Sequence, residues 1–438
     1  MILFYFLVLS LPFVDHGLFG REILGMTLEK IVGAACFLYA LAYLPRRRVL
    51  PELFVSAQAK VFTLYVVLAI TSYVLTAEDV LFRECFSIFL SQFLFFITAM
   101  ILVDSRERLQ NTILFLIGSI GLTSLYLIRE WIGNVPVYGL GYRPGWVAGD
   151  PNLFSASALV VLPLMLAPAT HAVRKWQRVG IVGCLGVTLF ALLIAASRGG
   201  FIGLVCMLLW RLRDARRRFM AFAISTLLLL LCLALPYSPL ERLLKPSASD
   251  VDSTNIRLQL WAASGKMFAD HPVFGVGLWN FHKYLHRYLP RGADFEAVVP
   301  HNTYVEVAVE LGGVGLLIFA GVLALSLWDL ERMRRAAVAA QDSYFSVLSS
   351  SLSDGLVGFG VAAMFLSALH AKVFWFAVFL SACIGPLLAQ SLRAAKEKEE
   401  EGETQETATV AAAEAPAAEV PAAAEPAPIR VGNWLTRH

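Results

Sequence analysis

Charged residues are scarce in this chain. Of its 438 residues only 16% are Asp, Glu, Lys or Arg, whereas 58% are hydrophobic. Soluble proteins carry roughly 25% charged residues, so the composition argues against a soluble enzyme and against a disordered protein. The formal net charge of +3 is too small to indicate a nucleic-acid partner, and the distribution of charge matters more than its sum.

Cysteine-based chemistry is missing as well. The cysteines have no metal-site spacing, and all six lie in apolar runs, outside the one long polar loop: Cys36, Cys85, Cys184, Cys206, Cys232 and Cys383. Such cysteines are typical of small core or lipid-facing residues. The sequence therefore predicts no disulfide scaffold, no metal site of the Cys/His type and no cofactor.

Long apolar runs are abundant instead. A helix needs ~20 apolar residues to cross the hydrocarbon core of a bilayer. Residues 1–14 count as a span, because no positive segment precedes them and no clean signal-peptide cleavage site follows. The sequence thus predicts an all-α, polytopic membrane protein with about twelve transmembrane helices, near 2–14, 23–44, 58–76, 84–103, 111–129, 153–170, 179–196, 200–210, 217–236, 303–328, 345–369 and 373–392.

Basic residues alternate between loops, which gives an orientation. The loops near residues 47, 107, 176, 215 and 333 are rich in Arg and Lys, whereas the alternate short loops hold only Arg21, Arg83, Arg143, Arg198 and Lys372. The positive-inside rule places the basic loops and both termini in the cytoplasm. Residues 179–210 have basic flanks on both sides, and a single helix of that length would be ~48 Å long. They are therefore predicted to form a tight helical hairpin with Arg198 at its outer turn.

These patterns divide the chain into four parts. Residues 1–236 hold transmembrane helices one to nine, including the short hairpin around 197–200, and residues 303–392 hold helices ten to twelve. Residues 237–302 form a large outer loop with short interfacial helices. Residues 393–438 begin with a Lys/Glu run and continue as an Ala/Glu/Pro/Thr stretch, which is too polar to bury a core and predicts a disordered cytoplasmic tail.

Two arginines on the outer side stand out. A charge at membrane depth costs at least ~2.5 kcal/mol and is a functional hypothesis by default, so Arg198 is predicted to bind a ligand rather than only to snorkel. The two glycines that follow it are expected to leave room for that ligand. Arg257 is expected in the first turn of a helix capped near Asp252–Thr254, beside an apolar stripe of Ile256, Leu260, Ala263 and Met267. A cation there opposes the helix dipole, which favours an anionic partner over a plain surface role.

A second outer helix is expected at 278–288, with Phe281, Leu285 and Tyr288 on its apolar side. His301 precedes the tenth span, where a helix N-terminus would keep the imidazole neutral and able to accept a proton from a hydroxyl; a simple helix cap is the alternative. Glu306 and Glu310 follow on one helix face, and they need partners inside the bundle, for which the arginines are candidates.

The remaining polar motifs are weaker. Asp150 and Pro151 are explained as the start of a helix, whereas Arg143 is not and is a candidate third anion contact. Asp250 and Asp252 form a DxD triplet, a pattern that can hold a divalent metal, but helix capping explains it equally well and no metal site is predicted. Arginine's planar fork suits phosphate oxygens, so the outer arginines predict a site for a lipid-linked pyrophosphate.

At these residues the sequence resembles the O-antigen ligase superfamily of bacterial membrane proteins. The resemblance covers roughly residues 140–330 and depends on the order of four motifs. These are Arg143-Pro-Gly with Asp150-Pro-Asn152; Ser197-Arg198-Gly-Gly-Phe201; Arg257-x-x-x-Trp261 running on to His271-Pro-x-Phe-Gly-Val-Gly277; and His301-Asn-Thr-Tyr-x-Glu306 with Glu310-Leu-Gly312.

The resemblance implies a GT-C-like, metal-independent, inverting glycosyltransferase in the bacterial inner membrane. Its active site would face the periplasm, with undecaprenyl-pyrophosphate-linked glycan as donor and lipid A–core as acceptor, and membrane lipids around it. Arg198 and Arg257 would hold the donor pyrophosphate and assist catalysis, and His301 would be the catalytic base. Arg143, Asn302 and Glu306 are the further substrate-binding candidates.

Three alternatives stay open. A Wzy-type polysaccharide polymerase and a protein O-oligosaccharyltransferase would use the same donor chemistry with a different acceptor. A twelve-span transporter is the third, although transporters typically show paired repeats and charges near the membrane midplane. Here the charge gathers at the outer face, which favours a glycan ligase.

Overall fold

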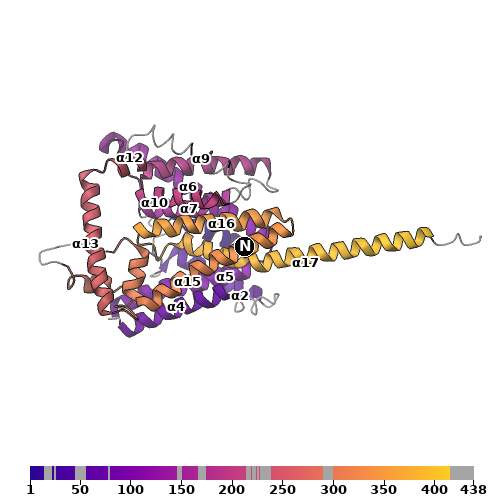
Figure 1. The fold of residues 1–438 in the computed structure, drawn as a ribbon, viewed down its shortest axis with the longest axis horizontal. Helices are drawn as coiled ribbons and strands as arrows, with labels where there is room; N and C mark the ends of the chain where they lie inside the picture. The colour runs from indigo at the N-terminus through magenta and orange to yellow at the C-terminus, as the bar shows by residue number, and fades with distance from the viewer. Residues whose placement is uncertain are drawn as a thin grey trace, which may run out of the picture. The chain divides into compact units, whose positions relative to one another are not determined.

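The computed structural model describes residues 1–13, 22–23, 26–44, 56–76, 79–145, 150–165, 174–213, 219, 223, 226, 238–289 and 299–414. The chain divides into two units, Met1–Ala389 and Gln390–His438. The first unit is a bundle of helices, and within it α13 runs across one end, transverse to α15 and α16 (Figure 1).

Most of the described residues are helical, as predicted. The one strand pairing among them is a two-residue antiparallel pair, β1 (Glu22–Ile23) with β2 (Met26–Thr27). The helices are α1 (Ile2–Ser10), α2 (Leu28–Tyr43), α4 (Ala57–Thr76), α5 (Asp79–Leu102), α6 (Arg106–Tyr138), α7 (Pro151–Val161), η3 (Pro163–Met165), α9 (Lys175–Ala195), α10 (Arg198–Arg211), α12 (Pro239–Leu244), α13 (Ala248–Asp270), α14 (Phe281–Leu285), α15 (Thr303–Ala339), α16 (Ser343–Ala362), η5 (Ala363–Phe365) and α17 (Lys372–Glu414).

Five helices in the described part of the chain are long and apolar enough to cross a membrane. They lie in α6, α9, α15, α16 with η5, and α17, and shorter apolar helices occur at 57–72, 86–102 and 151–165. Nearly all of the predicted span at 217–236 lies outside the described residues. The count of twelve transmembrane helices therefore stays a prediction, whereas a helical protein with several segments that are long and apolar enough to cross a membrane is confirmed.

The predicted break in the run 179–210 is present. Helix α9 ends at Ala195, Ala196 adopts a left-handed conformation (φ 47°), and α10 begins at Arg198 with Ser197 as its N-cap. The two arms do not simply lie against each other, because α7 packs against both of them. Arg198 thus occupies the first position of a helix, at the end of the bundle that α13 crosses.

Close backbone approach holds α7, α10 and α16 together. A Cβ added to Gly200 would lie 2.6 Å from the Cβ of Ser155 on α7, and one on Gly203 would lie 2.6 Å from the carbonyl oxygen of Gly358 on α16. Side chains at these positions would separate the three helices. The second glycine after Arg198 is thus needed for packing, whereas the sequence suggested that it leaves room for a ligand.

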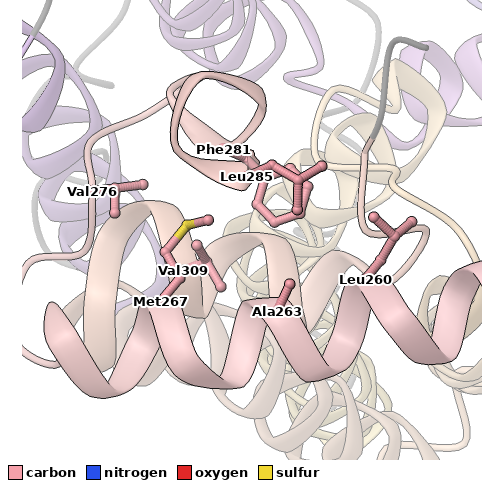
Figure 2. Packing of buried hydrophobic residues seen from close by; sticks show 7 residues of the cluster. All are labelled: Leu260, Ala263, Met267, Val276, Phe281, Leu285 and Val309. Carbon is pink, nitrogen blue, oxygen red and sulfur yellow. The ribbon is translucent and has the colours of Figure 1, made fainter. Parts of the chain in front are cut away.

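The long loop forms three helices, α12, α13 and α14, where two were expected. Seven side chains of this region pack into a buried apolar cluster that joins α13 and α14 to α15 (Figure 2): Leu260, Ala263, Met267, Val276, Phe281, Leu285 and Val309. Most of the predicted stripe on α13 is therefore buried, but Ile256, its first member, is 38% exposed. Of the three residues expected on the apolar side of the second outer helix, Phe281 and Leu285 are buried. Tyr288 is only partly buried and lies after the end of α14.

Other boundaries differ from the prediction. Helix α13 begins at Ala248 with a capping box between Ser247 and Asp250, not near Asp252–Thr254, because Ser247 already supplies the cap. Arg257 therefore lies in the middle of α13, and the expected opposition to the helix dipole in its first turn does not apply. Helix α6 extends to Tyr138 and shortens the loop that was expected to start at 130.

Helix α15 is interrupted at Gly312. This residue has φ 68° and ψ −169°, a combination that is nearly restricted to glycine. The interruption frees backbone groups that pair with the segment before α14. The N–H groups of Val276 and Gly277 donate to the carbonyls of Val309 and Glu310 at 2.9 Å each. In return, the N–H of Gly313 donates to Pro272 O at 2.8 Å.

This pairing explains two of the sequence motifs. His271-Pro-x-Phe-Gly-Val-Gly277 and Glu310-Leu-Gly312 lie far apart in the sequence but form one hydrogen-bonded unit. The short helical segment 303–311 is thereby fastened to the outer helices as well as to the rest of α15.

The second unit begins within α17, which continues as a helix to Glu414. Residues 393–414 are therefore helical, where the sequence predicted a disordered tail. Ala, Glu and Lys are good helix formers, and Glu/Lys pairs on neighbouring turns add support. Residues 415–438 lie outside the described residues.

The interruption at Gly312 leads to a test of the fold. Gly312→Ala should lower the free energy of unfolding by about 2 kcal/mol or more, because a Cβ there would collide with the backbone of Val273. Gly183→Ala on α9 is the matched control, since a Cβ at that position would meet nothing within 4 Å. Thermal unfolding in detergent would measure both, and equal stability of the two variants would contradict the proposed need for glycine at 312.

Candidate functional site

A pocket of about 180 Å³ opens at the end of the bundle that α13 crosses. Its walls come from the first turns of α10 and α13, from α12, from the start of α7 and from the end of α16 with η5. The positive ends of three helices thus converge on it, which favours negative charge. Fourteen residues line the pocket: Arg143, Asn152, Ser197, Arg198, Gly199, Gly200, Arg242, Ser249, Asp250, Ser253, Arg257, Ala362, Phe365 and Leu366.

Four arginines and one carboxylate make up the charge of the pocket lining. Arg143, Arg198 and Arg257, the three arginines singled out from the sequence, are brought together here from three separate elements. The fourth is Arg242 on α12. Four cations against Asp250 leave a formal excess of three positive charges, which suits an anion of more than one charge.

Two of these arginines stabilise the end of α9. Arg143 donates from Nε to the carbonyl of Ala195 at 3.0 Å, and Arg242 donates from Nη1 to the carbonyl of Ala196 at 2.7 Å. Cations at the negative end of a helix are favourable, and they satisfy carbonyls that the helix leaves free. Arg143 and Arg242 thereby hold the turn that positions Arg198.

A hydrogen-bonded chain joins this turn to α7. Arg143 Nη2 donates to Asn152 Oδ1 at 3.2 Å, and the hydroxyl of Ser197 donates to the same oxygen at 2.8 Å. The Ser197 oxygen in turn accepts the N–H of Gly200 at 3.1 Å. Asn152 therefore connects the starts of α7 and α10. Burial, followed by the charge of Arg242, lowers the pKa of Arg143 to about 10, so its guanidinium stays charged at neutral pH.

Arg257 retains a buried N–H group that is not hydrogen-bonded within the described part of the chain. Its Nη1 donates to the carbonyl of Phe365 at 3.2 Å, whereas its buried Nε has no hydrogen-bond partner among the described residues. Burial and the nearby charge of Arg198 lower the pKa of Arg257. A buried cation that retains a free N–H group gains from an anionic ligand.

Arg198 shares Asp250 with Arg242. Arg198 Nη2 lies 3.7 Å from Asp250 Oδ1, and Arg242 forms a closer ion pair with the same oxygen. Burial alone would raise the pKa of Asp250, but hydrogen bonds from Arg242 and Ser247 outweigh it and bring the pKa to about 2. Asp250 is therefore an anion throughout the physiological range.

His301 lies next to the arginine group, although it does not line the pocket itself. The indole of Trp261, one turn after Arg257 on α13, donates to the carbonyl of Pro300 at 2.8 Å and fixes the backbone beside His301. His301 has a positive φ of 49°, which is uncommon outside glycine and is found at functional sites.

The pKa of His301 is lowered by burial and by the nearby charge of Arg257. The expected direction is therefore confirmed, but the helix N-terminus is not the cause that the structure indicates. Asn302, not His301, caps α15, since its side-chain oxygen accepts the N–H groups of Tyr304 and Val305 at 3.0 and 3.1 Å. The imidazole is left available for another role.

Asn302 and Glu306 do not reach the pocket. Asn302 is occupied as a cap, and Glu306 is 7% exposed within the bundle. The carboxylate of Glu310 accepts the backbone N–H groups of Trp279 and Phe281, so it is not paired with an arginine of the pocket. Substrate binding by Asn302 or Glu306 therefore has no support from their positions.

The two aspartates of the DxD triplet lie in different environments. Asp250 is 3% exposed and bound by arginine, whereas Asp252 is exposed. In the part of the chain that the structure describes, no three His, Cys, Asp or Glu side chains gather in a way that could hold a metal ion. Asp250 acts here as a counter-ion for arginine.

Sequence reasoning missed Arg242, Ser197 and Asn152 as members of this group. Ser197 and Asn152 lie inside motifs that had been noticed, but only their neighbours carry charge. Arg242 had no distinguishing signal, because only the fold brings α12 beside the turn at Ala196.

With this geometry established, a comparison with known families is informative. Residues 183–320 match the family model described as O-antigen ligase. This match, which covers about a third of the chain, supports membership of the O-antigen ligase superfamily. The match contains Arg198, Arg242, Asp250, Arg257 and His301, and it ends shortly after the interruption at Gly312. No curated protein matches the chain.

Membership supports some general statements about function. Members of this superfamily are glycosyltransferase-like ligases and polymerases, so a ligase or polymerase type of activity on lipid-linked glycans is supported for this chain. Together with the apolar helices, the match also indicates a multi-pass membrane protein.

The bridging role of Arg143 can be tested. Arg143→Lys should lower the free energy of unfolding by about 2 kcal/mol, because one ammonium cannot replace the fork that joins Ala195 to Asn152. Arg129→Lys is a suitable control, since Arg129 is an exposed residue of α6. Thermal unfolding of the purified proteins would compare them, and an unchanged stability in Arg143→Lys would show that the bridge is dispensable.

Proposed function

We propose that this protein is an O-antigen ligase. It transfers a glycan from undecaprenyl pyrophosphate to a sugar hydroxyl of lipid A–core, at the periplasmic face of the bacterial inner membrane and without a metal ion. The observation that carries the proposal is the arginine-lined pocket at three helix N-termini, with an available histidine beside it. Membership of the O-antigen ligase superfamily supports the same assignment.

In this proposal the pocket binds the pyrophosphate of the donor. Arg198 and Arg257 bind its oxygens directly, because Arg257 has an N–H group without a partner among the described residues and Arg198 is held only by a long ion pair to Asp250. Arg143 and Arg242 position the turn that carries Arg198. Since charge builds up on the bridging oxygen as the glycosidic bond breaks, the same cations stabilise the leaving group.

His301 is the proposed general base. The acceptor hydroxyl gives its proton to the neutral imidazole while its oxygen bonds to the anomeric carbon. The bond from that carbon to the phosphate oxygen breaks, and the electron pair leaves with undecaprenyl pyrophosphate. Attack opposite the leaving group inverts the anomeric centre. Burial of His301 near Arg257 favours the neutral form that this step needs.

A reconstituted transfer reaction would test the assignment. Purified full-length protein would receive undecaprenyl-pyrophosphate-linked glycan with or without lipid A–core, in the presence of EDTA. We expect a lipid A–core conjugate that forms only with this acceptor. His301→Ala should abolish it, whereas His286→Ala should not, because His286 is an exposed residue just after α14.

The other outcomes of this reaction are equally informative. Longer carrier-linked chains without lipid A–core would show a polymerase, and transfer to an added protein would show an O-oligosaccharyltransferase. Loss of product in EDTA would contradict the metal-independent mechanism. Solute uptake into vesicles without any glycan transfer would favour a transporter.

The environment of His301 also predicts a pH dependence. The imidazole must be neutral to accept a proton, and its pKa lies below the usual 6.5. The transfer rate should therefore stay level at neutral pH and fall only as the pH drops through a midpoint below 6.5. Initial rates between about pH 5 and pH 8 would measure this, and a midpoint above 6.5 would contradict the role of His301 as base.

A further inference from the structure

An internal carboxylate lies within the proposed anion site. Asp250 is 3% exposed and lines the pocket together with the four arginines. Its two oxygens have different surroundings. Oδ2 accepts the backbone N–H of Ser247 at 3.2 Å and the Ser247 hydroxyl at 2.9 Å, and more weakly the Nε–H of Arg242 at 3.4 Å. Oδ1 faces Arg242, its ion-pair partner, and Arg198 at 3.7 Å.

Helix capping explains only half of this arrangement. The capping box of α13 uses Oδ2, since this oxygen serves Ser247. Oδ1 contributes nothing to the cap, yet it is the oxygen that lies between two arginines of the pocket. A carboxylate oxygen held between two guanidinium groups has the environment that a phosphate oxygen would require.

The pocket thus contains two positions for an anion. One is beside Arg257, whose buried Nε has no partner among the described residues. The other lies between Arg198 and Arg242 and is already filled by Asp250. A diphosphate has two phosphate groups and would need both positions, whereas a single phosphate needs only one.

We propose that Asp250 is an internal substitute for one phosphate of the diphosphate ligand. This proposal rests on the proposed function, because it concerns the same pocket. With the pocket empty, Asp250 holds Arg198 and Arg242 together against their mutual repulsion. When the donor binds, one of its phosphates binds Arg198 and Arg242, and the contact between Asp250 and Arg198 breaks. When the diphosphate product leaves, Asp250 returns and competes for the arginines, so the product is held less tightly.

Two other carboxylates, those of Asp150 and Asp252, have to be compared with Asp250 as internal partners of the pocket arginines. Asp150 is close enough to influence Arg143, Arg257 and His301 electrostatically, but its side chain caps α7 through Asn152 and it does not line the pocket. Asp252 belongs to the same triplet as Asp250 but is exposed. Only Asp250, among the described acidic residues, lines the pocket and pairs with its arginines.

Calorimetric titration with inorganic pyrophosphate tests the proposal. Asp250→Asn keeps the size of the side chain and an acceptor oxygen but removes the charge. The purified full-length variant should bind pyrophosphate at least about tenfold more tightly than the unaltered protein. The tightest orthophosphate site should have similar affinity in both proteins, because the position beside Arg257 is open in each, whereas only the variant should bind a second orthophosphate between Arg198 and Arg242.

Asp252→Asn is the matched control for the loss of one negative charge, and its affinity for pyrophosphate should stay unchanged. If both variants bound pyrophosphate more tightly by the same factor, the effect would be due to net charge alone and the proposal would be overturned. Unchanged or weaker binding by Asp250→Asn, with normal binding by the unaltered protein, would also overturn it while leaving the anion site intact. If the unaltered protein bound no pyrophosphate, the proposed function of the pocket would fail together with this proposal.

Folding of the variant must be separated from binding. Size-exclusion chromatography and far-UV circular dichroism would show whether Asp250→Asn keeps α12 and α13 in place. If it does not, Ser247→Ala provides a second test, because it keeps the charge but removes the hydroxyl that orients it. A less firmly held Asp250 should compete less well, and pyrophosphate should then bind more tightly, whereas unchanged affinity would overturn the proposal.

Discussion

The carbonyl groups at the end of α9 are the constraint on which the site depends. A helix that stops inside the bundle leaves unpaired carbonyls, and here Arg143 and Arg242 bind those of Ala195 and Ala196. Because these two cations hold the turn, α10 begins with Arg198 already at the pocket. The same turn provides Ser197, which ties α10 to Asn152 on α7. The two arginines that satisfy the carbonyls at the end of α9 thus also add positive charge to the pocket, as binding of the proposed diphosphate would require.

Much of this arrangement could be predicted from the sequence. The basic flanks of 179–210 predicted a break at Arg198, and the apolar spacing on α13 predicted that Leu260, Ala263 and Met267 would be buried. Both depend on local patterns, and the structure contains both. The order of the four motifs also indicated the superfamily that the match to residues 183–320 supports.

Long-range features could not be predicted in the same way. Arg242 contacts Ala196 across 46 positions of the chain, and Arg257 contacts Phe365 across 108. The spacing of apolar residues along the sequence gives no indication of contacts between residues so far apart. Helix starts were also misjudged, because Ser247 is as good a cap as the residues near Asp252, and this error moved Arg257 from the middle of its helix to the first turn. Asn302 and Glu306 were grouped with the site because they belong to the motif that begins at His301, and a motif does not say which of its side chains point into the pocket.

The interruption of α15 has a mechanical consequence. The segment 303–311 follows His301 directly, and it is separated from the rest of α15 by the extended backbone at Gly312. Its carbonyls at Val309 and Glu310 are bonded to the loop between α13 and α14, and Trp261 of α13 holds Pro300. Thr303 bonds to Leu366 and Ala368, and Tyr304 bonds to Gly360 at the end of α16. The backbone at His301 is therefore held by the outer helices and by the membrane bundle at once, so a shift of either part would move the imidazole relative to Arg198.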